Sequence, residues 1–387
     1  MSETMLTVPQ GSFTLRRLHT PNRSPLRAWS AADEMALRDL ADLDSGETVL
    51  VLNDAWGALS VGLAQHAPTV WSDSALARDA IDANLKENDL EPLGPRAVRG
   101  NEIPVGSFSV AVVVVPKSHV LLRWQLAAIW PLLAPDARVL GVAMARHVNK
   151  AVVGAFRASI GEPTPRLAER KARLIDVSVA DHDGGSEPMV RYAFRTDDDL
   201  AVWESPGVFS ARHLDVGTAL LLEELATAGP NGEELELPDR PQVADLGCGN
   251  GVVAATLAKR WPRAAFALFD VSDLAIEAAR ATWSANELGG HRMKSHVCDG
   301  FGSTKDDSFD LVITNPPFHQ EHAVDRDLTD RLLAETARVV RPSGSVIVVA
   351  QRHLHLHTRM LKWFESVEVV SGHPSHVVLL ASGVVTR

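Results

Sequence analysis

The sequence has few cysteines and no long apolar run. Cys248 and Cys298 are the only two cysteines among 387 residues, which excludes a disulfide framework and a multi-cysteine zinc site. No stretch approaches the roughly 20 apolar residues that cross a bilayer, and residues 1–17 lack the apolar middle of a signal peptide. We therefore expect a soluble, cytoplasmic protein.

The sequence also lacks an excess of positive charge. A net charge of −11 and a pI near 5.7 argue against polyanion binding by the whole surface, because such binding depends on Lys and Arg neutralising phosphates. Basic residues are concentrated locally, since residues 138–173 hold eight Lys or Arg against two Glu. A solvated helix face commonly explains such a run. The alternative is RNA contact, for which Arg170, Lys171 and Arg173 are the candidates.

Short β-branched runs alternate with stretches of helical period, and this alternation occurs twice along the chain. It indicates two parallel α/β domains, which suits the length. The expected strands of the first half lie near residues 48–52, 69–71, 110–115 and 138–142, with helices near 74–88 and 119–133. Those of the second half lie near 243–246, 265–269, 294–297, 309–313, 345–349, 367–370 and 376–380, with helices near 252–260, 273–286 and 328–340. We place the domains at residues 1–190 and 191–387, because polar and Gly-rich segments interrupt the pattern between residues 181 and 203.

A glycine-rich loop follows the first expected strand of the second domain. Gly247, Gly249 and Gly251 allow the backbone to turn sharply and approach a ligand closely. The spacing Gly-x-Gly-x-Gly, with Asp245 two residues ahead, differs from the Gly-x-Gly-x-x-Gly of dinucleotide enzymes and favours S-adenosylmethionine. We expect Asp245 to hold the ammonium group of that cofactor. The loop, including Asn250, would bind its methionine end, with the backbone N–H groups facing the carboxylate.

Two further aspartates follow the next two strands. Asp270 lies 25 residues beyond Asp245, at the distance from which a carboxylate can accept hydrogen bonds from both ribose hydroxyls. Asp299 is placed to meet the adenine amino group. A single aspartate at a strand end is more often a helix cap, but three in register behind a glycine-rich loop favour a cofactor site. Cys248 is expected to fill space in the loop, because no basic partner adjoins it to stabilise a thiolate.

The segment Asn315-Pro316-Pro317-Phe318 follows the apolar run that ends at Ile313. Such a turn often only ends a strand. Its position in a domain with this glycine loop favours catalysis of amine methylation. The Asn315 side-chain oxygen and the Pro316 carbonyl can accept hydrogen bonds from an exocyclic amine and orient its lone pair toward the methyl group. Pro317 stiffens the turn, Phe318 can stack on a flat substrate, and Asn315 also borders the cofactor.

The first domain resembles a weak copy of the second without the functional residues. Residues 53–57 (Asn-Asp-Ala-Trp-Gly) stand in place of the glycine loop, and Val115-Pro116-Lys117 stands in place of Asn-Pro-Pro-Phe. We predict that this copy neither binds the cofactor well nor catalyses. The run His353-x-His355-x-His357 lacks accompanying cysteines or a clear carboxylate set, so we expect a strand end or helix start there and no metal.

These motifs together resemble those of the two-domain ribosomal RNA guanine-N2 methyltransferases, closest to the large-subunit branch. The resemblance spans nearly the whole chain. In the second half it rests on residues 207–210 (Gly-Val-Phe-Ser), 214–217, 245–251, 315–320 and 349–354; in the first half it rests on residues 28–34, 53–59, 73–74, 116–117 and 171–175. It implies two tandem Rossmann-like methyltransferase domains, the first without a working site. It also implies that Phe209 and Ser210 cover the cofactor.

The same resemblance implies methyl transfer from S-adenosylmethionine to the N2 amine of one guanine in large-subunit ribosomal RNA, with S-adenosylhomocysteine as the second product. The guanine must be unpaired and unstacked, so the RNA would be naked or incompletely assembled, and the first domain would grip it. Three alternatives stay open from the sequence. They are a small-subunit ribosomal RNA guanine-N2 methyltransferase, a protein-glutamine N5-methyltransferase, and a non-catalytic RNA-binding assembly factor on a methyltransferase fold.

Overall fold

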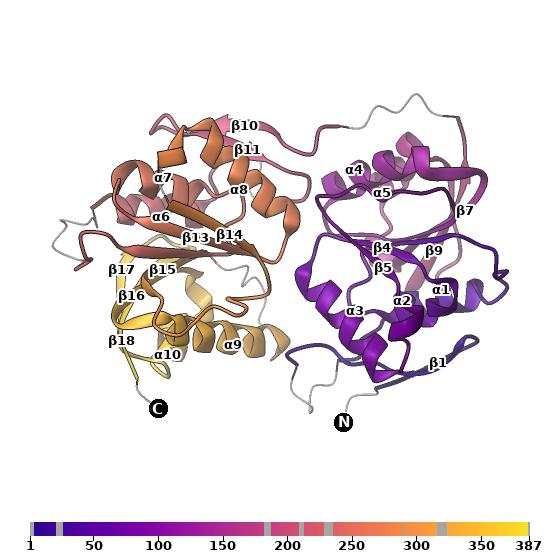
Figure 1. The fold of residues 1–387 in the computed structure, drawn as a ribbon, viewed down its shortest axis with the longest axis horizontal. Helices are drawn as coiled ribbons and strands as arrows, with labels where there is room; N and C mark the ends of the chain where they lie inside the picture. The colour runs from indigo at the N-terminus through magenta and orange to yellow at the C-terminus, as the bar shows by residue number, and fades with distance from the viewer. Residues whose placement is uncertain are drawn as a thin grey trace. The chain divides into compact units, whose positions relative to one another are not determined.

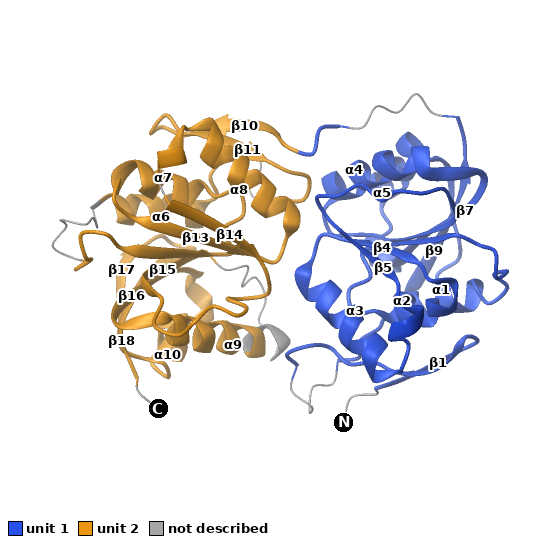
Figure 2. Ribbon diagram, viewed as in Figure 1, with its two compact units in different colours: residues 1–189 blue, residues 190–387 orange. Residues whose placement is uncertain are grey.

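The computed structural model describes residues 4–20, 26–181, 187–208, 213–227, 235–290, 292–315 and 323–385. The chain divides into two compact units, residues 1–189 and 190–387 (Figure 2). Each unit contains a seven-stranded sheet with helices packed on both of its faces (Figure 1). Within the described ranges, no helix is long and apolar enough to span a membrane.

Unit 1 begins with a separate two-stranded hairpin and continues into its main sheet. Its strands are β1 (Met5–Val8), β2 (Gly11–Thr14), β3 (Val49–Leu52), β4 (Thr69–Ser72), β5 (Arg96–Arg99), β6 (Phe108–Val114), β7 (Leu133–Met144), β8 (Gly161–Pro165) and β9 (Ala172–Val179). Its helices are α1 (Ala31–Asp39), α2 (Ala58–Gly62), α3 (Ala75–Glu87), α4 (His119–Ile129) and α5 (Lys150–Ser159).

Unit 2 has the same plan, again after a separate hairpin. Its strands are β10 (Arg191–Arg195), β11 (Ala201–Glu204), β12 (Gln242–Leu246), β13 (Ala265–Asp270), β14 (Arg292–Val297), β15 (Phe309–Thr314), β16 (Val340–Gln351), β17 (Phe364–Gly372) and β18 (His376–Val384). Its helices are α6 (Val216–Thr227), α7 (Val252–Arg260), α8 (Asp273–Ala285), α9 (Ala323–Val339) and α10 (Leu356–Met360).

The two main sheets share one strand order. Unit 2 runs β14-β13-β12-β15-β16-β18-β17, and unit 1 runs β5-β4-β3-β6-β7-β9-β8. In each unit five strands are parallel and the last two form an antiparallel hairpin. The prediction of two tandem Rossmann-like α/β domains is confirmed. The chain reverses direction across the sheet beside β12, and ligands of such folds bind at this switch point, outside the carboxyl ends of the strands.

Side chains of the unit 2 strands alternate between two cores. Ile313 and Val349 pack in one core with residues of α6, α7 and α8. Val312 and Val348 pack in the other with residues of α9 and α10. Successive strand residues point to opposite faces of the sheet. A residue two positions after Ile313 or Val349 therefore lies on the same face as these two, the face covered by α6.

The separate hairpin of β1 and β2 was not predicted, nor were three strands at or beside an edge of the main sheet of unit 1, namely β5, β8 and β9. β8 contains Pro163 and Pro165 and reads as a loop, yet proline is tolerated in an edge strand because one side of the strand needs no partner. β5 is the other edge and has two arginines in four residues. β9, which pairs with β8, was missed together with it. Apolar runs predict central strands well, and these edge elements lack such runs.

Candidate active site

Three loops of unit 2 meet at the carboxyl edge of its parallel strands. In the ladders Leu246, near the end of β12, is opposite Phe269 of β13 and Thr314 of β15. The loops that follow these strands therefore begin side by side. The sequence places the glycine-rich loop, Asp270 and Asn315 in these positions.

The glycine-rich loop connects β12 to α7 and has a conformation that requires glycine. Gly247, Gly249 and Gly251 have φ of 70°, 54° and 73°, the left-handed region that other residues rarely adopt. A Cβ on Gly251 would lie 2.8 Å from Cβ of Ala279 in α8, whereas a Cβ on Gly247 or Gly249 would meet nothing within 4 Å. Gly251 therefore allows two helices to pack closely, and the other two leave open space in front of the loop.

The expectation that the loop's N–H groups face a bound carboxylate is wrong for four of them. Gly247 and Cys248 donate to the Phe269 carbonyl at 2.8 and 3.1 Å, and Gly251 donates to the Cys248 carbonyl at 2.8 Å. Gly249 donates to Oδ2 of Asp270 at 3.0 Å. These four N–H groups donate to acceptors within the protein. The loop therefore contributes to a ligand site through its shape and the space in front of it.

Asp245 is a buried carboxylate with an unused acceptor. Its Oδ2 is fully enclosed and has no hydrogen-bond partner, although such groups are almost always paired. Burial raises the pKa of Asp245 to about 7; the Ala254 N–H opposes this, and the charge of Asp270 adds to it. An ammonium group would supply the missing partner. The unpaired acceptor of Asp245 and the open space at Gly247 and Gly249 fit the methionine end of S-adenosylmethionine.

Asp270 and Asn250 are held by the backbone around them. Oδ1 of Asp270 accepts from Ser272 N–H at 3.0 Å, and its other oxygen accepts from Gly249. Burial raises the pKa of Asp270, and these N–H groups partly offset the effect. Oδ1 of Asn250 accepts from Val252 N–H at 3.3 Å. Carboxylate oxygens accept more than one hydrogen bond, so these contacts leave the proposed ribose role of Asp270 possible and fix its orientation.

Asp299 has a partner that the sequence did not reveal. Both of its oxygens accept from Nη2 of Arg331 in α9, at 2.7 and 2.8 Å. Arg331 also bonds Glu335, at 2.6 Å, and Glu335 accepts from Phe301 N–H at 3.1 Å. This network ties α9 to the loop after β14. Each oxygen of Asp299 retains acceptor capacity, and its contact with adenine stays a prediction.

The Asn315 amide is held by the start of α6. Its Nδ2 donates to Thr218 Oγ1 at 2.9 Å and lies 3.4 Å from Asp215 Oδ1. Thr218 Oγ1 in turn donates to Asp215 Oδ2 at 2.5 Å. An ionised carboxylate only accepts, so it fixes the direction of the whole chain of hydrogen bonds. The Asn315 N–H groups must point toward α6, which leaves its Oδ1 available as an acceptor.

Asp215 and Thr218 are functional candidates that the sequence analysis gave no role. A signal for Asp215 existed, because an Asp just before an apolar helix is a capping pattern. Asp215 Oδ1 indeed accepts from Gly217 and Thr218 N–H at 3.0 and 3.1 Å. The sequence could not show that this cap also contacts Asn315, 97 residues from Thr218.

Some predicted residues lie outside the described residues. These are Phe209 and Ser210 of the expected cofactor cover, and Pro316, Pro317 and Phe318 of the catalytic turn. Cys248 is buried, and burial raises the pKa of its thiol well above the usual range. A group so hard to ionise is a poor nucleophile, as expected of a residue that fills space.

In unit 1 the corresponding edge is occupied by the protein's own side chains. Leu52 pairs with Trp71 and Val113 as Leu246 pairs with Phe269 and Thr314, so Asn53 corresponds to Gly247. Asn53 Nδ2 donates to Gln125 Oε1 at 2.8 Å and to the carbonyl of Val114 at 3.0 Å. Gln125 donates back to Asn53 Oδ1 at 2.9 Å. This register aligns Val114 with Asn315. The sequence analysis had aligned Val115 with Asn315, one residue later.

Two other edge residues of unit 1 also lack the properties of their counterparts. Val51, fully buried, stands in the position of Asp245. Asp54 is buried, but both of its oxygens accept hydrogen bonds, from Gly57 N–H at 2.9 Å and from Ser60 N–H and Oγ at 2.8 Å. Burial raises the pKa of Asp54, and both of its oxygens already have partners at the start of α2.

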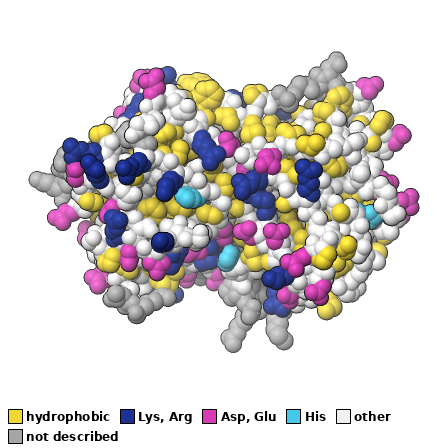
Figure 3. All heavy atoms as spheres, in the orientation of Figure 1, with side chains coloured by type: hydrophobic (Ala, Val, Ile, Leu, Met, Phe, Trp, Pro, Cys, Tyr) yellow, Lys and Arg dark blue, Asp and Glu magenta, His cyan; other side chains and the backbone are white. Residues whose placement is uncertain are grey.

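The basic segment of unit 1 is half neutralised. Four of its eight cations form ion pairs with carboxylates, namely Arg138, Arg157, Arg166 and Arg170. On the face shown in Figure 3, Lys and Arg side chains are interspersed with Asp and Glu. Of the three RNA-binding candidates, Arg170 pairs with Glu34 at 3.3 Å, Lys171 is exposed and Arg173 is half-buried.

The histidine-rich segment lies at the same edge of the unit 2 sheet. A short 3-10 helix, η6 (Arg352–Leu354), follows β16, and His355 is the N-cap residue of α10. A strand end and helix start were predicted here. Among the residues that the structure describes, no group of three or more His, Cys, Asp or Glu could hold a metal ion.

Comparisons with known proteins cover nearly the whole chain. Residues 3–181 match the RLMG N-terminal domain, and residues 199–380 match the methyltransferase small domain. A Streptomyces coelicolor protein named ribosomal RNA large subunit methyltransferase G is 36% identical, over 97% of this chain and 99% of its own length. A Pseudomonas putida protein of the same name is 35% identical, over 97% and 99%.

A solved structure shares the fold of both units. It is a T. thermophilus 16S ribosomal RNA N2 methyltransferase in complex with AdoMet and guanosine. The TM-score is 0.77 at 22% identity, over 98% of this chain and 97% of the other. With relatives above 30% identity over nearly the full length, the chain belongs to the ribosomal RNA large subunit methyltransferase G family.

Proposed function

We propose that this protein transfers the methyl group of S-adenosylmethionine to the exocyclic N2 amine of a guanine in large-subunit ribosomal RNA. Unit 2 is the catalytic part. Unit 1, whose corresponding edge is filled by Asn53 and Gln125, binds RNA without a working site of its own. The relatives' printed names supply the RNA class, and a ribosomal RNA substrate supports a cytoplasmic location.

The observation that carries this proposal is the fixed direction of the Asn315 amide. Its Oδ1 is presented at the sheet edge because Thr218 and Asp215 take its N–H groups. An acceptor in that place can bind an N–H of an exocyclic amine. The amine lone pair, otherwise delocalised into the base, is then directed away from the ring.

The remaining residues bind different parts of the cofactor. Asp245 takes the ammonium group of the cofactor, Gly247 and Gly249 leave space for its methionine end with Asn250 beside them, and Asp270 and Asp299 take ribose and adenine. Phe209 and Ser210 cover the cofactor, as the family resemblance implies. When bound, S-adenosylmethionine supplies an electrophilic methyl group on a positively charged sulfur.

The chemistry requires no metal and no strong base from the protein. The amine nitrogen would take the methyl group that bound S-adenosylmethionine supplies, with S-adenosylhomocysteine as the second product. Asn315 Oδ1 and the Pro316 carbonyl hold the two N–H groups, Pro317 stiffens the turn, and Phe318 stacks on the guanine. The methylated nitrogen is acidic and releases its proton to water.

The direct test uses labelled S-adenosylmethionine with three acceptors: protein-free ribosomal RNA of both subunits, assembled subunits and a release factor. We expect label in the N2 position of one guanine of naked or incompletely assembled RNA. Label only in the release factor would overturn the proposal, as would label only in small-subunit RNA. Asn315→Ala should abolish most turnover while cofactor affinity stays within a few-fold of wild type; an equal loss of both would contradict its assigned role.

A further inference from the structure

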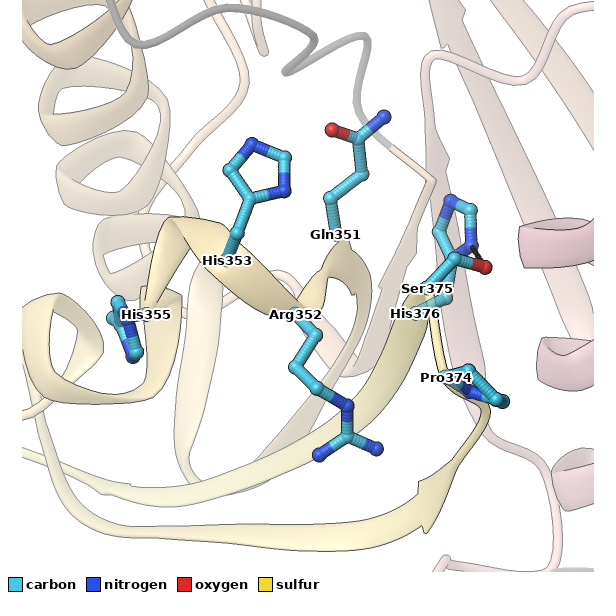
Figure 4. Close-up of a pocket in the computed structure, with 7 residues that line it drawn as sticks. All are labelled: Gln351, Arg352, His353, His355, Pro374, Ser375 and His376. Carbon is cyan, nitrogen blue, oxygen red and sulfur yellow. Dashed lines mark hydrogen bonds between the residues drawn. The ribbon is translucent and has the colours of Figure 1, made fainter.

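A hollow at the end of β16 lies beside the proposed catalytic residue and has no role in the mechanism above. It has a volume of about 500 Å³, within the roughly 300–1,000 Å³ typical of ligand sites. It is lined by residues 351–353, 355 and 374–376 (Figure 4). Gln351, His353 and His376 are among its lining residues. The lining contains no Asp or Glu, although the protein carries a net charge of −11.

Strand register places this hollow next to Asn315 on the same face of the sheet. Thr314 of β15 is opposite Val348 of β16, so Gln351 extends about two residues farther along the edge than Asn315. With strands about 4.8 Å apart and a rise of about 3.3 Å per residue, their Cα atoms are separated by roughly 8 Å. Gln351 follows Val349 by two residues, as Asn315 follows Ile313, so both side chains point to the face that carries α6.

His376 extends this row onto the next strand. It is directly opposite Gln351 in the antiparallel ladder of β16 and β18, and directly opposed residues share a face. Its Nδ1 is 2.8 Å from Ser375 Oγ, which fixes the ring. Figure 4 shows Gln351 and His353 pointing to the same side of the chain, while Arg352 points to the opposite side. Arg352 donates to the His373 carbonyl at 3.2 and 3.0 Å and so holds the β17–β18 turn.

We propose that this hollow binds the RNA nucleotide adjacent to the target guanine, and this rests on the proposed function. A carboxamide can form two hydrogen bonds with a base edge, and imidazole rings stack on unstacked bases. Once the target guanine leaves its stack to reach Asn315, the neighbouring nucleotide is exposed and lies within reach of Gln351, His353 and His376. The hollow therefore selects which guanine is methylated.

The experiment compares Gln351→Ala and His353→Ala, singly and together, with the wild type. The matched control is His357→Ala, which alters an exposed histidine of the same segment that does not line the hollow. Each protein is assayed for S-adenosylmethionine affinity, for kcat/KM on protein-free large-subunit RNA, and for the position of the methylated guanine. We expect the double variant to lose roughly tenfold or more in kcat/KM and to methylate additional guanines, with unchanged cofactor affinity. The control should match the wild type.

Three results would overturn the inference: wild-type kcat/KM and target choice in the double variant, a fall in cofactor affinity that accounts for the loss, or an equal loss in the control. His353 is exposed, so the single His353→Ala variant remains decisive if the double variant folds poorly. The failure of the proposed function is distinguishable, because the wild type itself would then leave the RNA unmethylated.

Discussion

Thr218→Val is the most informative single change in the catalytic site. Valine has nearly the shape of threonine without the hydroxyl. Thr218 is buried, with 7% of its surface exposed, so the substitution creates no cavity. It removes the acceptor 2.9 Å from Asn315 Nδ2 and the donor 2.5 Å from Asp215 Oδ2. What remains to orient the Asn315 amide is the 3.4 Å contact with Asp215.

The size of the effect follows from these contacts. Each lost hydrogen bond is worth about 1 kcal/mol net, and both support one orientation of the amide. If the two act on turnover, the loss of about 2 kcal/mol corresponds to roughly a 30-fold fall in kcat. The free energy of unfolding should also fall by about 2 kcal/mol, because both lost hydrogen bonds stabilise the folded protein. Asp215 still accepts from Gly217 and Thr218 N–H, which keeps the start of α6 capped.

The assay measures kcat and KM on RNA together with S-adenosylmethionine affinity. Thr218→Ser is the matched control, since it retains the hydroxyl and should stay within about threefold of the wild type. We expect Thr218→Val to lose turnover and keep cofactor affinity. Two results would refute the reasoning: unchanged turnover in Thr218→Val, or an equal loss in Thr218→Ser, which would show that the effect does not depend on the hydroxyl.

Three further predictions concern cofactor and RNA. Because burial raises the pKa of Asp245 to about 7 and an ammonium group needs the ionised form, calorimetry should detect proton release on S-adenosylmethionine binding at pH 6 but little at pH 8. Affinity should fall up to tenfold per unit below pH 7, and Asp245→Asn should remove this dependence; a pH-independent wild type would contradict the assignment. The same titration should give one cofactor site per chain, and two sites would disprove the silent role of unit 1. Replacing Arg170, Lys171 and Arg173 with Ala should lower the salt slope of RNA binding by about one to two, less than three full contacts would give because Arg170 pairs with Glu34; an unchanged slope would exclude this patch.

The sequence predicts the position of a site residue when that residue lies at the end of a recognisable strand. The glycine loop, Asp270 and Asn315 follow strands directly, so a correct strand assignment was enough to bring them to one sheet edge. The partners of those residues were not predictable in this way. Thr218 reaches Asn315 and Arg331 reaches Asp299 only because helices dock on the sheet, and no local periodicity encodes that docking.

The contrast between the two units shows why burial alone does not identify a site. Asp54 and Asp245 are both buried carboxylates with raised pKa values. Asp54 satisfies its oxygens with the start of α2, whereas Asp245 leaves Oδ2 without a partner. A protein tolerates an unpaired buried acceptor at a cost of about 1–3 kcal/mol, and a ligand that completes the pair recovers it on binding. At the corresponding edge of unit 1, a cofactor site would require removal of the Asn53–Gln125 pair as well as a carboxylate in place of Val51.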